Sequence, residues 1–227
     1  MLSNDEEYIN EVMSNVVNVR TQDLLPKAHQ MFLDKMRCQF EFCPNVVYDI
    51  GAAVLHWTRH CERVWGESKI YLFDAFAPAE KCYYGYDYNM GVLADEDDTE
   101  IKFYQNDMLF GGNSIYREVG EVFPEDKYII KKTKKLDTVV KGKGYRLPDL
   151  IKIDVQGAEL LVLKGAVETL KHCKYLIVEL QDVHYNEGAP LADETIQWLK
   201  EHDFECVARK FSDNGPDADY CFVNTKI

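Results

Sequence analysis

Four side chains of this sequence have the chemistry and the placement that acid–base catalysis needs. Asp154 and Glu179 each end a short apolar run, while Glu159 and His184 follow them by five residues each. A carboxylate or an imidazole within hydrogen-bond reach can take a proton from a weak nucleophile. A charge inside an apolar strand is costly unless it is paired or used. The four residues therefore predict a catalytic centre, although Glu159 also fits a simple role at the start of a helix.

A second group of acidic residues is typical of a ligand site. Asp49 lies two residues before Gly51, and a glycine after a strand lets the backbone approach a ligand closely. Asp74 ends the next apolar run, at roughly the spacing of about twenty residues at which an acid binds ribose hydroxyls in nucleotide-binding folds. A plain turn aspartate is the other interpretation of Asp74. The predicted cofactor-binding residues are Asp49, Gly51, Ala52, Asp74, Ala75 and Asp95.

A strand, a tight turn and a helix must position the catalytic acids. Residues 149–166 read DLIKIDVQGAELLVLKGA, which opens with a β-branched, apolar run from Leu150 to Val155 that only Lys152 and Asp154 interrupt. Such a run predicts a parallel strand buried on both faces. Gly157 makes the turn, and from Ala158 onward the apolar residues follow a helical period. Asp154 is thereby predicted at the carboxyl end of a strand, where open α/β sheets bind ligands.

Further elements flank this unit. Residues 5–40 predict one or two helices, with a further helix beginning near Ala53 and another over residues 191–202. Residues 90–95 predict a third strand that forms a hairpin with residues 101–104, and the chain ends in two strands joined by a polar turn. The polar loop 106–114 is typical of a segment that closes over a substrate. The basic segment 131–146 fits a solvated face or a site that attracts an anionic acceptor. The predicted substrate-binding residues are Gln156, Asn113 and Ser114.

The segment DLIKIDVQGAELLVLKGA resembles the signature of the FkbM family of S-adenosylmethionine (SAM) dependent methyltransferases. The resemblance covers roughly residues 45–225 and departs from the family pattern at Gln156, where glutamate is usual, and at Ala53 and Leu55, where asparagine and a second glycine are usual. Leu55 is therefore expected to add bulk beside the methionine part of the cofactor. The final antiparallel hairpin also fits the resemblance.

The resemblance implies a fold, a cofactor and a reaction. The implied fold is α/β and Rossmann-like, of the class I methyltransferase type: a mostly parallel sheet with an antiparallel C-terminal strand and helices on both faces. The implied cofactor is SAM, and the implied reaction is O-methylation of a sugar or glycan hydroxyl. Whether a divalent metal also binds at Asp154 and Glu179 stays open. The domain prediction is a helical cap at residues 1–44 and one methyltransferase domain at residues 45–227.

Composition narrows the remaining possibilities. The 227 residues suffice for one α/β domain, and the formal net charge of −13 disfavours nucleic acid as a partner. The seven scattered cysteines, the acidic N-terminus and the lack of a membrane-spanning run predict a cytoplasmic protein without a membrane partner. A non-catalytic binding module on the same fold remains an alternative. A dehydrogenase is disfavoured because GxGxxG does not follow the first strand, and an esterase because GxSxG is missing.

Overall fold

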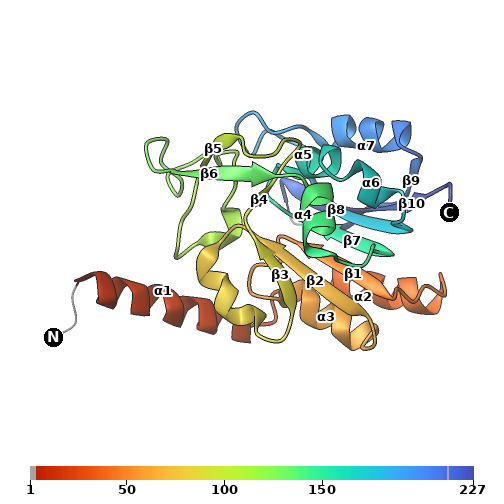
Figure 1. Cartoon of the computed structure of the whole chain (residues 1–227), viewed down its shortest axis with the longest axis horizontal. Helices are drawn as coiled ribbons and strands as arrows, with labels where there is room; N and C mark the ends of the chain where they lie inside the picture. Colours follow the sequence, from red (N-terminus) through yellow and green to blue (C-terminus); the bar gives the residue numbers. More distant parts are fainter. Residues whose placement is uncertain (1–3, 214) are drawn as a thin grey trace.

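A seven-stranded sheet forms the centre of the computed structural model, which describes residues 4–213 and 215–227 (Figure 1). The strand order is β3-β2-β1-β7-β8-β10-β9, and only β10 runs antiparallel to the others, because both of its neighbours, β8 and β9, pair with it in the antiparallel sense. This topology confirms the predicted Rossmann-like methyltransferase fold. The strands are β1 (Val46–Ile50), β2 (Lys69–Asp74), β3 (Asp87–Met90), β7 (Leu150–Ile153), β8 (Tyr175–Gln181), β9 (Phe204–Asp213) and β10 (Asp217–Asn224).

Helices cover both faces of the sheet, as predicted (Figure 1). Alternate side chains of one strand enter two different cores: Tyr48 and Ile50 pack under one helical layer, and Val47 packs under the other. Both faces are buried, which explains why the central strands β1, β7 and β8 are mostly apolar. One layer contains α2 (Lys27–Cys38) and α3 (His56–Val64); the other contains α4 (Leu136–Lys143), α5 (Glu159–Lys164), α6 (Val167–Leu170) and α7 (Ala192–Glu201).

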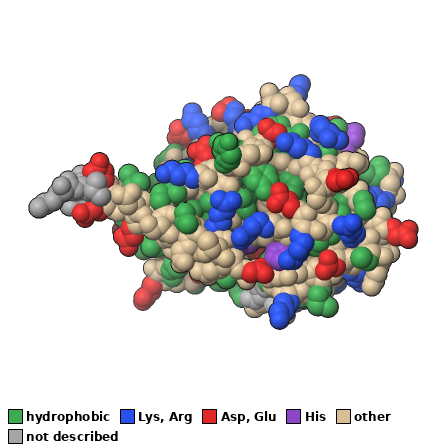
Figure 2. All heavy atoms as spheres, turned by 90° about the horizontal axis from the view of Figure 1, so that it is seen from below, with side chains coloured by type: hydrophobic (Ala, Val, Ile, Leu, Met, Phe, Trp, Pro, Cys, Tyr) green, Lys and Arg blue, Asp and Glu red, His purple; other side chains and the backbone are tan. Residues whose placement is uncertain are grey.

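Helix α1 (Asn4–Thr21) reaches out from the body of the molecule (Figure 1). It is tied to the loop after β5 by two hydrogen bonds, from the Tyr8 hydroxyl to Asp107 at 2.9 Å and from the Asn15 amide to the Met108 carbonyl at 2.8 Å. Within the described residues, no helix has the length and apolar character needed to cross a bilayer. On the face that Figure 2 shows, acidic and basic side chains are interspersed, so the negative net charge is not gathered there.

A small second sheet corrects two of the sequence predictions. Its strand order is β4-β6-β5, with β4 (Val92–Leu93), β5 (Glu100–Phe103) and β6 (Ile129–Lys134). The strand predicted at residues 90–95 is present only as the short β4, and its expected place as the third strand is wrong, because β3 takes that place in the main sheet. The predicted hairpin is also wrong, because β6 lies between β4 and β5 and pairs with both. The basic segment 131–146 supplies most of β6 and α4, and two short 3-10 helices complete the fold, η1 (Ala77–Tyr83) and η2 (Phe110–Gly112).

The turn after β1 also differs from the prediction, since α3 begins at His56 and not near Ala53. Gly51, Ala53 and Leu55 have φ values of +81°, +42° and +72°, which an α-helix does not accept. The Leu55 side chain is fully buried in the core that contains α2 and α3. The expectation that Leu55 adds bulk beside the cofactor is therefore wrong, because the left-handed backbone turns this side chain into the core.

Candidate functional site

Two adjoining hollows open at the carboxyl ends of the parallel strands. The first encloses about 870 Å³ including its open mouth, and the second about 620 Å³. Both are lined by Gly51, Ala53 and Asp154, so they meet where β1 and β7 end. This is the position at which open α/β sheets bind ligands. A ligand that spans the two hollows must pass over Asp154.

Gly51 allows the two halves of the site to meet. A Cβ atom added at Gly51 would lie 1.7 Å from the carbonyl oxygen of Asp154, and the φ of +81° is itself unfavourable for any other residue. The Gly51 N–H donates to the Phe73 carbonyl at 2.8 Å, and the Asp154 N–H donates to the Ile50 carbonyl at 3.0 Å. The turn after β1 is thus fixed against both neighbouring strands.

The first hollow combines one acid with apolar walls. Asp74 lies at the end of β2, and its two carboxylate oxygens accept backbone N–H groups of Ala53 and Phe76, each at 2.7 Å. Burial raises the pKa of Asp74, although these two donors act against the rise. The walls include six apolar side chains, namely Phe73, Phe76, Val92, Leu93, Phe103 and Phe110. An acid at this strand end beside an apolar slot fits the ribose and the flat base of a nucleoside.

Asn113 gives a second observation in favour of a ligand in the first hollow. Its side-chain nitrogen is buried and has no hydrogen-bond partner among the described residues, while its oxygen accepts the Asn106 N–H at 2.7 Å. Burying an unpaired amide donor costs free energy, which a ligand acceptor would recover. Ala75 and Ser114 also line this hollow. The Ser114 hydroxyl donates to the Val155 carbonyl at 3.2 Å, so it contacts the turn after β7.

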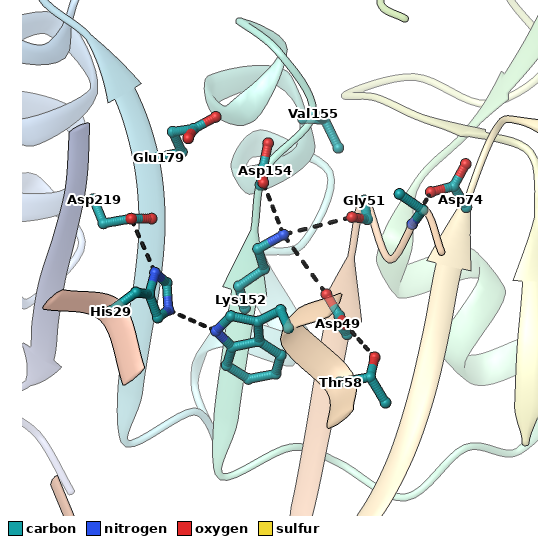
Figure 3. A network of polar contacts seen from close by, with 12 residues as sticks. His29, Asp49, Gly51, Thr58, Asp74, Lys152, Asp154, Val155, Glu179 and Asp219 are labelled. Atoms are coloured by element: carbon teal, nitrogen blue, oxygen red, sulfur yellow. Dashed lines mark hydrogen bonds and ion pairs between the residues drawn. The ribbon is translucent and has the colours of Figure 1, made fainter. Parts of the chain in front are cut away.

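A buried lysine connects the acids of β1 and β7 (Figure 3). The Lys152 ammonium lies 3.0 Å from Asp154 Oδ2 and 3.8 Å from Asp49 Oδ1. Burial lowers the pKa of Lys152, but Asp154 and Asp49 outweigh this effect and the net pKa lies above the usual value. Asp49 is fully buried, and the Thr58 hydroxyl donates to it at 2.5 Å. Asp49 therefore contacts Lys152 and Thr58 and lies behind the lining of the two hollows.

Asp154 and Glu179 converge, as the sequence predicts. The Gln156 amide nitrogen donates to Asp154 Oδ1 at 2.9 Å and to Glu179 Oε2 at 2.8 Å. Burial and the adjacent Asp154 raise the pKa of Glu179 well above its usual value. Burial also opposes the ionisation of Asp154, yet Lys152, Glu179 and Gln156 hold its pKa below the usual value. The pair thus favours a negative charge on Asp154 and a proton on Glu179.

The second hollow contains polar residues that are not among the predicted site residues. His29 of α2 lies 2.9 Å from Asp219 of β10 through Nδ1, and accepts the Trp57 indole N–H at Nε2 over 2.7 Å (Figure 3). All three line the hollow together with Glu179 and Lys152. His29 and Asp219 are 190 residues apart. No local pattern connects them, and only the sheet topology brings them together.

Glu159 has a different position from the one expected of a catalytic acid. Its Oε1 accepts the backbone N–H groups of Val155 at 2.9 Å and of Gly157 at 3.1 Å. Its side chain is buried, and burial raises its pKa to about 7, although these backbone donors act against the rise. Glu159 therefore stabilises the turn between β7 and α5 through its backbone N–H groups. It lines a small separate hollow that also contains Gln156 and Glu179.

Two other predicted site residues lie apart from this centre. Asp95 follows β4, and His184 is exposed in the loop after β8. The described residues that line the two hollows include neither of them, whereas Ala52 does line the second. Within residues 4–213 and 215–227, no group of three or more His, Cys, Asp or Glu side chains is arranged to hold a metal ion.

Comparison with known proteins gives one sequence match and several structural ones. The sequence model of the methyltransferase FkbM domain matches residues 46–206. Among curated proteins, none is significantly similar in sequence. Human N-acetylserotonin methyltransferase in complex with SAM is 10% identical with a TM-score of 0.49, and the alignment covers 95% of this chain but only 56% of that one. A precorrin-6y C5,15-methyltransferase from Geobacter metallireducens is 10% identical with a TM-score of 0.44, covering 86% and 87%. Magnesium protoporphyrin IX methyltransferase from Synechocystis with bound SAM is 11% identical with a TM-score of 0.42, covering 88% and 81%.

Proposed function

Since this chain belongs to the FkbM methyltransferase family, we propose that it transfers the methyl group of SAM to a hydroxyl of a sugar or glycan. The observation that carries this proposal is the meeting of the two hollows at Asp154. One hollow has the acid and the apolar walls that a nucleoside needs. The other is lined by carboxylates that an acceptor hydroxyl could contact on the far side of Asp154. A cofactor in the first hollow and an acceptor beside the second would bring the reacting atoms together above this residue.

The residues of the first hollow are suited to hold the nucleoside part of SAM. Asp74 would accept the ribose hydroxyls, because the Ala53 and Phe76 N–H groups already fix the direction of its carboxylate. The aromatic and aliphatic walls would contact the adenine ring, and the unpaired Asn113 nitrogen would donate to a ring acceptor. SAM, when bound, supplies an electrophilic methyl group on a positively charged sulfur. Holding two reactants in line can account for much of the acceleration.

Asp154 is the group best placed to take the proton of the acceptor hydroxyl. Lys152 holds it ionised, and it stands at the junction of the two hollows. In the proposed step the acceptor oxygen forms a bond to the methyl carbon while the bond from carbon to sulfur breaks, and the hydroxyl proton passes to Asp154. General-base assistance of this kind typically contributes about 10²–10⁴-fold. Glu179 and Gln156 would hold Asp154 in place.

The composition of the second hollow favours an acceptor rich in hydroxyl groups. Asp154, Glu179 and Asp219 offer carboxylate oxygens, while the single lysine of the lining is already paired. Hydroxyl groups donate to carboxylates, whereas an anionic acceptor would be repelled. A nucleic acid is disfavoured for the same reason and by the net charge of −13.

Calorimetric titration with SAM and S-adenosylhomocysteine tests the cofactor part of this proposal. Asp74→Asn should weaken binding of both ligands about 10- to 100-fold, because hydrogen bonds to a charged group contribute about 1.5–3 kcal/mol. Asp95→Asn is the matched control, since it removes one aspartate charge outside the two hollows. Equal affinity of the two variants would contradict the role of Asp74.

A screen of sugar acceptors with methyl-labelled SAM tests the reaction. Labelled product that requires Asp154 would support the proposal. SAM binding without transfer to any sugar or glycan would reject the acceptor class. Failure to bind either ligand would favour the alternative of a non-catalytic binding module on this fold.

A further inference from the structure

Gln156 has a backbone conformation that glutamine rarely adopts. It lies in the turn between β7 and α5 with a φ of +56°, in the left-handed region. That region is uncommon for residues other than glycine, and among the exceptions asparagine and aspartate are favoured. Strained residues of this kind persist where the surrounding structure determines them, and they cluster at functional sites. The contacts of the Gln156 side chain are therefore expected to stabilise this conformation.

The side-chain amide of Gln156 joins two buried carboxylates. Its nitrogen lies 2.9 Å from Asp154 Oδ1 and 2.8 Å from Glu179 Oε2. The other oxygen of Asp154 faces the Lys152 ammonium at 3.0 Å. Both oxygens of Asp154 therefore accept hydrogen bonds from the protein itself. β7 and β8 are paired neighbours, which brings the two acids to the same edge of the sheet.

The geometry of these contacts suits an N–H donor and disagrees with a divalent cation. The amide nitrogen stands at ordinary hydrogen-bond distances from one oxygen of each carboxylate, and these are oxygens that a Mg²⁺ or Ca²⁺ ion would need as ligands. The amide hydrogens and the ammonium of Lys152 are positively polarised. Both would repel a cation at the point where the two carboxylates face each other.

We propose that Gln156 is a positioning residue whose amide holds Asp154 and Glu179 together in the place that a divalent cation would take between carboxylates. In this arrangement the acid pair is assembled by protein donors alone. The inference goes beyond the proposed function, since it concerns how the acid pair is held, and it predicts cation binding without any reference to turnover.

A single substitution tests this inference directly. Gln156→Glu replaces the donor nitrogen by an acceptor oxygen at the same position. It adds a third carboxylate, at residue 156, to those of Asp154 and Glu179. Three oxygen donors at one point suit Mn²⁺, Mg²⁺ and Ca²⁺. We expect the variant to bind Mn²⁺ at least about tenfold more tightly than the wild-type chain, with a dissociation constant of about 10⁻⁴–10⁻³ M, typical of weak sites.

Electron paramagnetic resonance of Mn²⁺ is the measurement, because the signal of the free ion disappears when the ion binds. Gln197→Glu is the matched control: Gln197 is exposed on α7 and donates to one carboxylate, Glu201, at 2.7 Å. It adds the same charge away from the site and should leave Mn²⁺ binding at the wild-type level. SAM titration of each variant reports the cofactor site separately, so that loss of cofactor binding is distinguished from failure of the inference.

Three results would overturn the inference. Wild-type chain that binds Mn²⁺ as tightly as Gln156→Glu would mean that the amide turns its oxygen to a metal. A folded Gln156→Glu variant that binds no more Mn²⁺ than Gln197→Glu would mean that the three side chains do not converge. If Gln156→Glu does not fold, Gln156→Met removes the amide without adding charge and should bind Mn²⁺ more tightly than the wild type. A folded Gln156→Met variant that binds no more Mn²⁺ than the wild type would refute the role of the amide as the group that fills this place.

Discussion

Gly51→Ala is the substitution for which the structure gives the sharpest expectation. The added methyl group would lie 1.7 Å from the carbonyl oxygen of Asp154, where real contacts are at least 3.0 Å. The oxygen would have to retreat by more than about 1 Å. That movement strains the bond from the Asp154 N–H to the Ile50 carbonyl and shifts the acid at the junction of the two hollows. Both the free energy of unfolding and the affinity for a ligand should decrease.

The expected loss has two parts. A residue other than glycine with a left-handed backbone costs about 1–2 kcal/mol, and forcing an extra methyl group into a packed place costs about 1–3 kcal/mol. Gly51→Ala should therefore lower the free energy of unfolding by about 2–5 kcal/mol. SAM affinity should fall at least about tenfold, which corresponds to a loss of about 1.4 kcal/mol in binding free energy.

Gly85→Ala separates the two parts. Gly85 has a similar φ of +91°, but a Cβ atom there would meet nothing within 4 Å. This variant should lose only the backbone part, about 1–2 kcal/mol, and keep its affinity for SAM. Urea denaturation and calorimetry measure both quantities. If the two variants lose the same stability to within about 0.5 kcal/mol and bind SAM equally, the close approach of Gly51 to the Asp154 carbonyl contributes neither to stability nor to ligand binding.

Two further substitutions test the buried charges. Glu159→Gln should keep both backbone hydrogen bonds, because a single oxygen accepts them, and should remove a pH dependence. Burial raises the pKa of Glu159 from 4.5 to about 7, so its contribution to stability is complete below pH 4.5 and is lost as the pH rises through 7. The variant should thus exceed the wild type by up to about 3 kcal/mol at pH 8 and match it near pH 4.5; identical pH profiles in urea denaturation would contradict this. Lys152→Met should cost about 3–5 kcal/mol, because Asp49 and Asp154 lose their shared cation. Adding Asp49→Asn should restore part of that stability, and a double variant no more stable than the single one would refute the pairing.

The parts of the fold that the sequence predicts well are those with local causes. The strand, turn and helix of residues 149–166 follow from an apolar run, a glycine and a helical period, all visible within eighteen residues. The strand predicted at residues 90–95 is shorter than expected and belongs to the small sheet, because Gly91, with φ +151°, separates β3 from β4 and the two enter different sheets. The partner of both β4 and β5 is β6, more than 25 residues further along the chain than β5. Pairing over such a distance leaves no local pattern.

The site divides in the same way. The convergence of Asp154 and Glu179 is predictable, because each acid follows the apolar run of one of two neighbouring parallel strands, and the register places Ile153 beside Val178. The contact of His29 with Asp219 depends on α2 packing against β9, the neighbour of β10, and has no sequence signal of its own. Lys152 does have one: a lysine in a strand buried on both faces requires carboxylates nearby, since an unpaired buried charge is too costly. That rule could have selected Lys152 from the sequence alone.

The position of Lys152 changes what the acid on β1 does. Asp49 is fully buried behind the hollows, so it acts on a ligand only through its neighbours. It holds the Lys152 ammonium from one side, and the ammonium holds Asp154 from the other. Because one lysine is shared between β1 and β7, the ionisation of Asp154 depends on a residue that lies outside the lining of both hollows. The acid of the first strand is therefore better understood as a positioning residue for the proposed base than as a direct contact of the cofactor.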